Sequence, residues 1–169
     1  MRVVTRINPY LCKVMGEILR NRIQQSQEMS PYVDAMLNVL VCADYFRRLS
    51  EQVCSEHGIS LIQYNVLRIL KGAHPGGHSR CDIRSRLVER GTDITRLVDK
   101  LEAQGFAERT RSETDKRYSH TKITTKGIQL LQTLHPKIEA IDNMLSEVIS
   151  HKEAEKLSEI CEKIYSNEE

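Results

Sequence analysis

The sequence lacks any long uninterrupted run of apolar residues. A helix that crosses a membrane needs about 20 of them in succession, and no stretch of these 169 residues approaches that length. Residues 1–29 also lack the continuous apolar segment of a secretory signal. We therefore expect a cytoplasmic protein with no membrane partner.

Paired cysteines and metal-binding motifs are missing as well. The five cysteines are odd in number and widely scattered, and none forms a CxxC pair. Such usage is typical of a reducing compartment. None of the six histidines stands at zinc-site spacing from another histidine or a cysteine. We expect neither a metal nor another cofactor.

Single cysteines leave one alternative open, a redox sensor, because an accessible thiol with a lowered pKa can be oxidised. Cys81 lies near Arg80 and Arg84 and is expected to be exposed. Cys42 and Cys161 fall on the apolar sides of their helices and are expected to pack inside. We therefore expect that oxidation is not the main signal.

Catalytic motifs are also absent. The chain contains no nucleophile motif, phosphate-binding loop or carboxylate pair at a recognisable site. An enzyme is not expected. The composition, with 28% charged residues, 40% hydrophobic residues and no Trp, is that of an ordinary soluble globular protein.

A long helix is the first element that the sequence predicts. Ser30 and Pro31 suit the N-cap and the first turn of a helix. Helical apolar spacing then runs from Tyr32 to about Glu56, and Gly58 marks the end. Such a helix spans roughly 37 Å at 1.5 Å per residue. Because this exceeds the usual helix of a small domain, we expect part of it to pack against a second chain.

Three shorter helices are predicted next, over residues 61–71, 80–88 and 93–102. Ser60 and Ser79 cap the first two, and Gly105 stands where the third should stop. The second and third are joined by a tight turn and form a helix-turn-helix. The third helix has an apolar edge of Ile94, Leu97, Val98 and Leu101 and a polar edge of Thr92, Asp93, Thr95, Arg96 and Lys100.

A β-hairpin follows, with strands over 106–110 and 118–124 and a charged tip over 111–117. Between His78 and Lys122 there are 11 Lys or Arg against 8 Asp or Glu, whereas the rest of the chain has 14 against 15. The positive excess thus lies in this segment. A polar, Arg-bearing helix fits a major groove about 12 Å wide, and a narrow hairpin reaches the minor groove. The segment is therefore expected to bind DNA.

Helical 3-4 spacing of apolar residues returns after Thr125 and continues, after a break near Ser150, to the end of the chain. Pro136 is expected to kink the first helix or to mark a restart, because it removes a backbone donor. A sustained 3-4 pattern is typical of a helix-packing seam. Its members are Leu131, Leu134, Ile138, Ile141, Leu145, Val148, Ala154, Leu157, Cys161 and Ile164.

A series of short segments between Tyr32 and Tyr165 is specific in its order and spacing, although no single segment is. The segments are Gly58-Ile59-Ser60, Gln63-Tyr64-Asn65-Val66-Leu67, Ile83, Leu87, the run 93–102, Gly105-Phe106, Arg109, Asp115-Lys116-Arg117 and Ile123-Thr124-Thr125-Lys126-Gly127. In these segments the sequence resembles the MarR family of bacterial transcription regulators. The turn at 88–92 and the N-terminal extension depart from the family pattern.

The resemblance implies a mainly α fold with a small β-hairpin wing. A winged helix-turn-helix is flanked by N- and C-terminal dimerisation helices, which interleave in a triangular homodimer. It divides the chain into an N-terminal extension, residues 1–29, partly helical or disordered, and a MarR-type domain, residues 30–169. Within that domain, residues 59–127 form the winged helix-turn-helix, and residues 30–57 and 128–166 supply the dimerisation helices.

The same resemblance places the hairpin tip on DNA. It implies that Arg117, held by Asp115, enters the minor groove, where A·T runs attract Arg. Lys116 is expected to contact a phosphate. The competing interpretation is a solvated turn whose ion pair contributes little.

The helix over 93–102 is expected to enter the major groove with its N-terminal end first. Arg96 can bond guanine through two of its guanidinium nitrogens. Asp93 either caps the helix or accepts a hydrogen bond from cytosine, and capping is favoured. The remaining candidate DNA contacts are Thr92 and Thr95 near the groove, Lys100 within reach of phosphate, and Ser79 and Arg80 as phosphate binders at a helix start.

The family often binds small aromatic acids between its dimerisation helices and its DNA-binding lobe. An aromatic or phenolic effector is therefore a candidate partner. Tyr45, Arg48 and Tyr64 are the residues proposed to line its site.

The function that these patterns favour is a homodimeric, sequence-specific DNA-binding repressor that recognises an inverted-repeat operator and is released by a small molecule. The alternative is a winged-helix adaptor that binds proteins without specific DNA binding. Loss of the basic wing residues would favour the adaptor, and they are present here.

Overall fold

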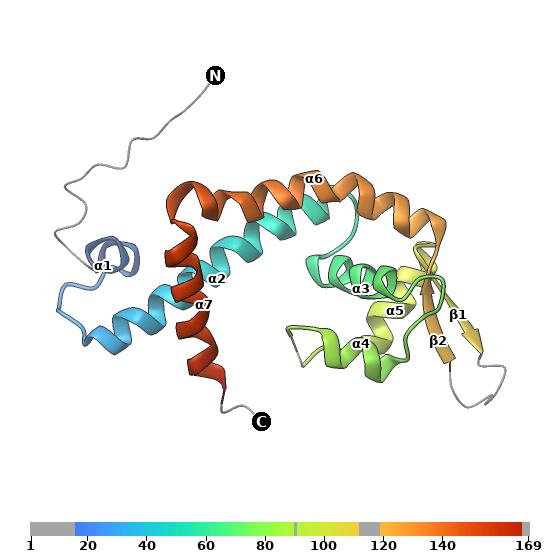
Figure 1. Ribbon diagram of the computed structural model, residues 1–169, viewed down its shortest axis with the longest axis horizontal. Helices are drawn as coiled ribbons and strands as arrows, with labels where there is room; N and C mark the ends of the chain where they lie inside the picture. The colour runs from blue at the N-terminus through green and yellow to red at the C-terminus, as the bar shows by residue number, and fades with distance from the viewer. Residues whose placement is uncertain (1–15, 90, 112–118, 167–169) are drawn as a thin grey trace, which may run out of the picture. The chain divides into compact units, whose positions relative to one another are not determined.

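The computed structural model describes residues 16–89, 91–111 and 119–166. Within these ranges the chain forms seven helices and one two-stranded antiparallel sheet (Figure 1). The chain divides into two compact units, Met1–Phe46 and Arg47–Glu169. None of the helices in the described ranges combines the length and the hydrophobicity of a membrane span.

The first unit contains α1 (Glu17–Ile23) and the beginning of α2 (Pro31–Ser55), which continues into the second unit. The Ser30 hydroxyl accepts a hydrogen bond from the Val33 amide at 3.3 Å, so the predicted cap is confirmed. The expectation for Cys42 is wrong, because its side chain is exposed. Much of the apolar side of α2 likewise remains uncovered, including Tyr32, Met36 and Leu40.

Helix α3 (Leu61–Gly72) begins at the predicted cap. The Ser60 hydroxyl accepts from the Gln63 amide, and the Gln63 side chain accepts from the Ser60 amide, which together form a capping box. Its inward face is almost wholly buried and packs against α4, β2 and α6. The buried side chains are Gln63, Tyr64, Val66, Leu67 and Leu70.

The helix-turn-helix consists of α4 (Arg80–Arg86) and α5 (Ile94–Ala103). Helix α4 stops two residues earlier than predicted, because Leu87 adopts an extended conformation and turns inward. Val88, which we had placed in the helix, is 94% exposed. The two helices contact each other, and each buries an isoleucine almost completely, Ile83 on α4 and Ile94 on α5.

The hairpin consists of β1 (Ala107–Arg111) and β2 (Ser119–Ile123), paired antiparallel with Ala107 opposite Ile123. His78 exchanges two backbone hydrogen bonds with Thr121 and so ties the loop before α4 to the sheet. Figure 1 shows α3, α4 and α5 gathered beside this hairpin. Arg111, which we had placed in the tip, belongs to β1, and the rest of the predicted tip, residues 112–117, lies outside the described residues.

Helix α6 (Thr125–Val148) begins directly after the hairpin. Its Gly127 lies so close to the Phe106 carbonyl that a Cβ atom there would collide with it. It runs through Pro136 without a restart. After the predicted break, Ser150 and Glu153 form a capping box at the start of α7 (His151–Tyr165). The first half of the predicted seam, from Leu131 to Ile141, is buried. Helix α7 contributes no buried side chain.

Candidate nucleic-acid interface

Helix α5 presents one polar edge to solvent. Its opposite edge is fixed in the core by Ile94, Val98 and Leu101, each less than 2% exposed. As a consequence, Thr95, Arg96 and Lys100 are exposed together. This is the geometry that a groove-reading helix needs, while contact with DNA itself stays a prediction for these three residues.

Asp93 is the N-cap of α5. Its carboxylate accepts a hydrogen bond from the Arg96 amide at 3.2 Å. Of the two roles considered for Asp93, the structure therefore bears out capping. The bond also fixes the backbone of Arg96 in the first turn, so that its side chain leaves the helix at the end expected to enter the groove.

The start of α4 meets the start of α5 through two candidate DNA contacts. The Arg80 guanidinium donates to the Thr95 hydroxyl at 3.3 Å. Both donors of Ser79 are engaged, because its amide and its hydroxyl donate to Asp82 at 3.1 and 2.7 Å. These bonds hold the pKa of the Asp82 carboxyl below its ordinary value. A phosphate that bound Ser79 would have to displace this carboxylate.

Arg109 on β1 joins the base of the wing to α5, and sequence reasoning gave it no role. Its guanidinium pairs with Asp99 and lies 3.2 Å from a carboxylate oxygen of Glu102. The fork shape of guanidinium suits two acceptors at once. Arg109 thus holds the base of the wing to α5 and offsets the negative charge of Asp99. Its place in the family motif was the only signal.

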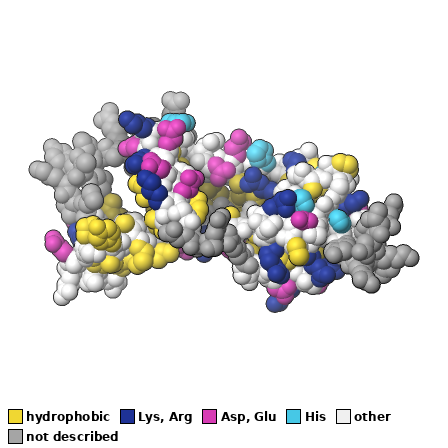
Figure 2. Space-filling view, turned by 60° about the horizontal axis from the view of Figure 1, so that its bottom comes forward, with side chains coloured by type: hydrophobic (Ala, Val, Ile, Leu, Met, Phe, Trp, Pro, Cys, Tyr) yellow, Lys and Arg dark blue, Asp and Glu magenta, His cyan; other side chains and the backbone are white. Residues whose placement is uncertain are grey.

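Positive side chains gather near the hairpin. Figure 2 shows Lys and Arg on the part of the surface next to the hairpin, with fewer Asp and Glu between them. The strongest wing candidates, Asp115, Lys116 and Arg117, lie outside the described residues, so their roles stay predictions. Thr92 is half-buried beside the turn that precedes α5.

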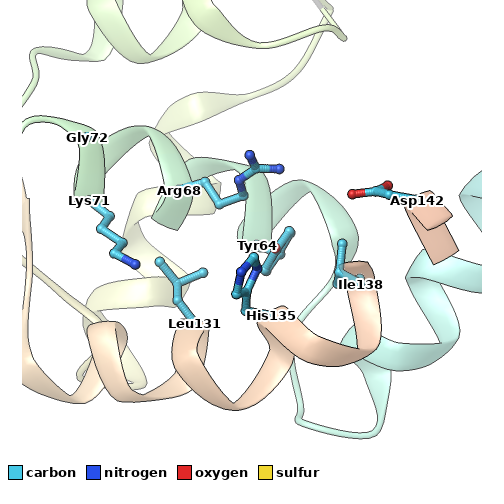
Figure 3. Close-up of a pocket in the computed structure, with 8 residues that line it drawn as sticks. All are labelled: Tyr64, Arg68, Lys71, Gly72, Leu131, His135, Ile138 and Asp142. Carbon is cyan, nitrogen blue, oxygen red and sulfur yellow. The ribbon is translucent and has the colours of Figure 1, made fainter. Parts of the chain in front are cut away.

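A cavity of about 410 Å³ lies between α3 and α6. Tyr64 and Arg68 of α3 face Leu131, His135 and Ile138 of α6 across it (Figure 3). Lys71, Gly72 and Asp142 complete the lining. Its size falls in the range of small-molecule sites.

The cavity contains one of the three predicted effector residues, Tyr64, and neither Tyr45 nor Arg48. Burial raises the pKa of the Tyr64 hydroxyl, and the nearby Arg68 opposes this effect. The guanidinium carbon of Arg68 lies 5.9 Å from the centre of the Tyr64 ring. Sequence reasoning missed Arg68, His135 and Lys71, since their shared location depends on how α3 and α6 pack.

The cysteines in the described part of the chain differ in accessibility. Cys81 is exposed, as expected, and Cys161 is half-buried. Cys54 is fully buried, and burial raises the pKa of its thiol to about 11, so it remains protonated at neutral pH. Cys12 falls outside the described residues. The ranges that the structure describes contain no cluster of three metal-binding side chains.

Comparison with known proteins supports the class of function that this arrangement defines. The sequence profile of the MarR family matches residues 57–117. The regulator MhqR of Bacillus subtilis, named as an HTH-type transcriptional regulator, is 34% identical over 113 residues, which cover 66% of this chain and 76% of MhqR. The transcriptional repressor MprA of Escherichia coli is 26% identical over 153 residues, covering 89% and 86% of the two chains.

Solved structures of other proteins share the fold of this chain. A MarR transcription factor from Planctomyces limnophilus superposes with a TM-score of 0.61 at 28% identity, covering 82% of this chain and 98% of its own. The MepR protein of Staphylococcus aureus, solved in complex with DNA, shares the fold with a TM-score of 0.69 at 21% identity, covering 83% and 98%. The fold and the exposed helix define a winged helix-turn-helix DNA-binding transcription regulator. The chain belongs to the MarR family.

Proposed function

We propose that the protein is a homodimeric repressor that binds an inverted-repeat operator. The observation that carries the proposal is the α5 helix, whose apolar edge is buried and whose Thr95, Arg96 and Lys100 side chains are presented together. In a two-fold dimer, two such helices would enter successive major grooves. Arg96 would read a base edge, and Arg80 and Lys100 would contact phosphates. The relative MprA is named a transcriptional repressor, which supports repression rather than activation of transcription.

The homodimer is supported by apolar surface that the single chain leaves uncovered. Helix α7 exposes Leu157, Ile160 and Ile164 along one side, and the N-terminal part of α2 exposes Met36 and Leu40. Apolar area removed from water contributes about 25 cal/mol per Å². A second copy that covers these side chains would therefore be stabilised chiefly by hydrophobic burial.

The experiment is selection of binding sites from random duplexes, followed by a salt titration on the selected operator and on scrambled DNA. We expect an inverted repeat with half-sites about one helical turn apart. Affinity for the operator should exceed affinity for scrambled DNA by on the order of 1,000-fold or more. Equal affinity for both duplexes would contradict the proposal and favour the protein-interaction adaptor.

We further propose that the cavity between α3 and α6 is the effector site, and that its ligand is a small amphipathic anion. Arg68 and Lys71 supply positive charge, and His135 adds a titratable ring. Leu131 and Ile138 provide an apolar wall. This combination suits an aromatic carboxylate, whose ring packs on the wall while its charge meets the guanidinium. CouR of Rhodococcus jostii RHA1, which shares the fold, was solved with p-coumaroyl-CoA, and this supports an aromatic acyl ligand.

The proposed requirement for a negative charge on the ligand can be tested directly. We expect 4-hydroxybenzoate to raise the melting temperature and to release operator DNA, and its uncharged methyl ester to do neither. The acid at a hundredfold excess over its Kd would stabilise the protein by about 2.7 kcal/mol. Arg68→Gln should weaken binding of the acid roughly 10- to 100-fold through loss of a charged hydrogen bond. Arg84→Gln, on an exposed arginine of α4 outside the cavity, is the control. If 4-hydroxybenzoate and its methyl ester had equal effects on the Arg68→Gln and Arg84→Gln variants, this site would be refuted.

A further inference from the structure

The C-terminal end of α5 is anchored at Gln104 to three other elements. The Gln104 side-chain amide donates to the Gly58 carbonyl at 2.8 Å. Its oxygen accepts from the Gln63 side-chain amide at 3.4 Å. The Lys126 ammonium donates to the Gln104 carbonyl at 2.7 Å. Helix α5, the proposed recognition helix, is thus tied at this end to the loop after α2, to the start of α3 and to the start of α6.

The groups that hold Gln104 are themselves fixed. Gly58 has a φ of +74° and its amide donates to the Ser55 carbonyl, so it belongs to the C-terminal cap of α2. Gln63 is only 6% exposed, and its oxygen accepts from the amide and the hydroxyl of Ser60 in the capping box of α3. One side-chain amide therefore links the end of α2 and the start of α3 to the end of α5.

The other end of α5 is held differently. Its buried Ile94 lies at the contact with α4, and the side-chain hydrogen bond to α4 runs from Arg80 to Thr95, a residue that we expect to face DNA. The Gln104 end differs in the reach of its side-chain hydrogen bonds, which join α5 to residues 46 and 41 positions away in the loop after α2 and in α3. This end therefore ties the orientation of α5 to elements outside the helix-turn-helix.

We propose that Gln104 is a positioning residue that fixes the recognition helix relative to the end of α2 and thereby sets the half-site spacing that the dimer accepts. The proposal rests on the proposed function, a homodimer on an inverted repeat. Half-site spacing follows from the separation of the two recognition helices. The primary amide suits this position because it donates and accepts at once without carrying charge.

Two substitutions separate positioning from simple stabilisation. Gln104→Met keeps the length of the side chain but removes both hydrogen bonds. Gln104→Lys restores a donor for the Gly58 carbonyl without an acceptor for Gln63. Gln129→Met makes the same chemical change at an exposed position of α6 and is the matched control. Circular dichroism and sedimentation would show that each variant remains folded and retains the wild-type assembly.

Affinity is then measured for the selected operator and for versions whose spacer is lengthened or shortened by one or two base pairs. We expect wild type and Gln129→Met to prefer the best spacer by at least about tenfold, a difference of about 1.4 kcal/mol. Gln104→Met should reduce this preference to roughly threefold or less, because the helix can reorient to reach shifted half-sites. Gln104→Lys should recover most of the preference.

A purely structural role would lower the melting temperature or weaken all spacers equally. An unchanged spacer ratio in Gln104→Met, with a clear ratio in wild type, would therefore overturn the positioning role and leave the proposed function intact. A wild type that binds all spacers and scrambled DNA alike would instead overturn the proposed function, and the positioning role with it.

Discussion

Arg96→Lys is expected to remove base discrimination at one position of each half-site while leaving the salt dependence of binding nearly unchanged. The lysine keeps the positive charge of the exposed arginine, but it lacks the planar fork that bonds guanine through two nitrogens. The loss should be on the order of 1–3 kcal/mol per half-site. Because a dimer uses two half-sites, affinity for the operator should fall well over tenfold.

Arg96→Ala removes the positive charge together with the planar fork, so comparison with Arg96→Lys separates base reading from charge. It should lose the same base preference, measured by the binding of operators that carry each of the four bases at that position.

Arg117→Ala should instead weaken every site with an A·T-rich flank and lower the salt slope by roughly 1 per subunit, if its contact is to phosphate charge. Lys152→Ala, an exposed cation of α7, is the control that should bind as wild type does. If both arginine variants remained folded dimers and bound the operator as tightly as wild type does, these two residues would not read DNA.

Ile164→Glu is expected to convert the dimer to a monomer and to reduce operator affinity more than 100-fold. Ile164 is 67% exposed in the single chain, on the same side of α7 as Leu157, which is 45% exposed. In a dimer interface these side chains would be buried, and a carboxylate there would lose its hydration without a partner. The loss of affinity follows because two linked half-site contacts become independent.

Sedimentation velocity at micromolar concentration measures the first effect, and fluorescence anisotropy on the operator measures the second. Lys152→Glu introduces the same charge on an exposed position of α7 and should remain dimeric. A wild-type protein that sediments as a stable folded monomer would refute the homodimer. A dimeric Ile164→Glu would show that this side of α7 is not the interface.

Local sequence was enough to predict most helix boundaries, because the groups that decide them lie three residues apart. Ser60, Ser79 and Ser150 each cap a helix through an i to i+3 bond, and Asp93 does the same for α5. Where a boundary depended on a distant contact, the prediction was less accurate. Helix α4 ends at Arg86 because Leu87 turns into the core, which helical periodicity alone could not show.

The sequence by itself determined the winged helix-turn-helix, the face of α5 that is exposed and the family. Spacing within one helix decides these properties, since side chains three or four residues apart share a face. Only the tertiary structure revealed the α3–α6 cavity, the Arg109 ion pairs and the Gln104 anchor. The side-chain hydrogen bonds of Gln104 reach Gly58 and Gln63, which lie 46 and 41 positions away in the sequence. Cys42 was misjudged for the related reason that an apolar stripe predicts a packing surface but not which chain covers it. Helix periodicity specifies a direction on each helix, whereas the meeting of two helices depends on every loop and packing contact between them.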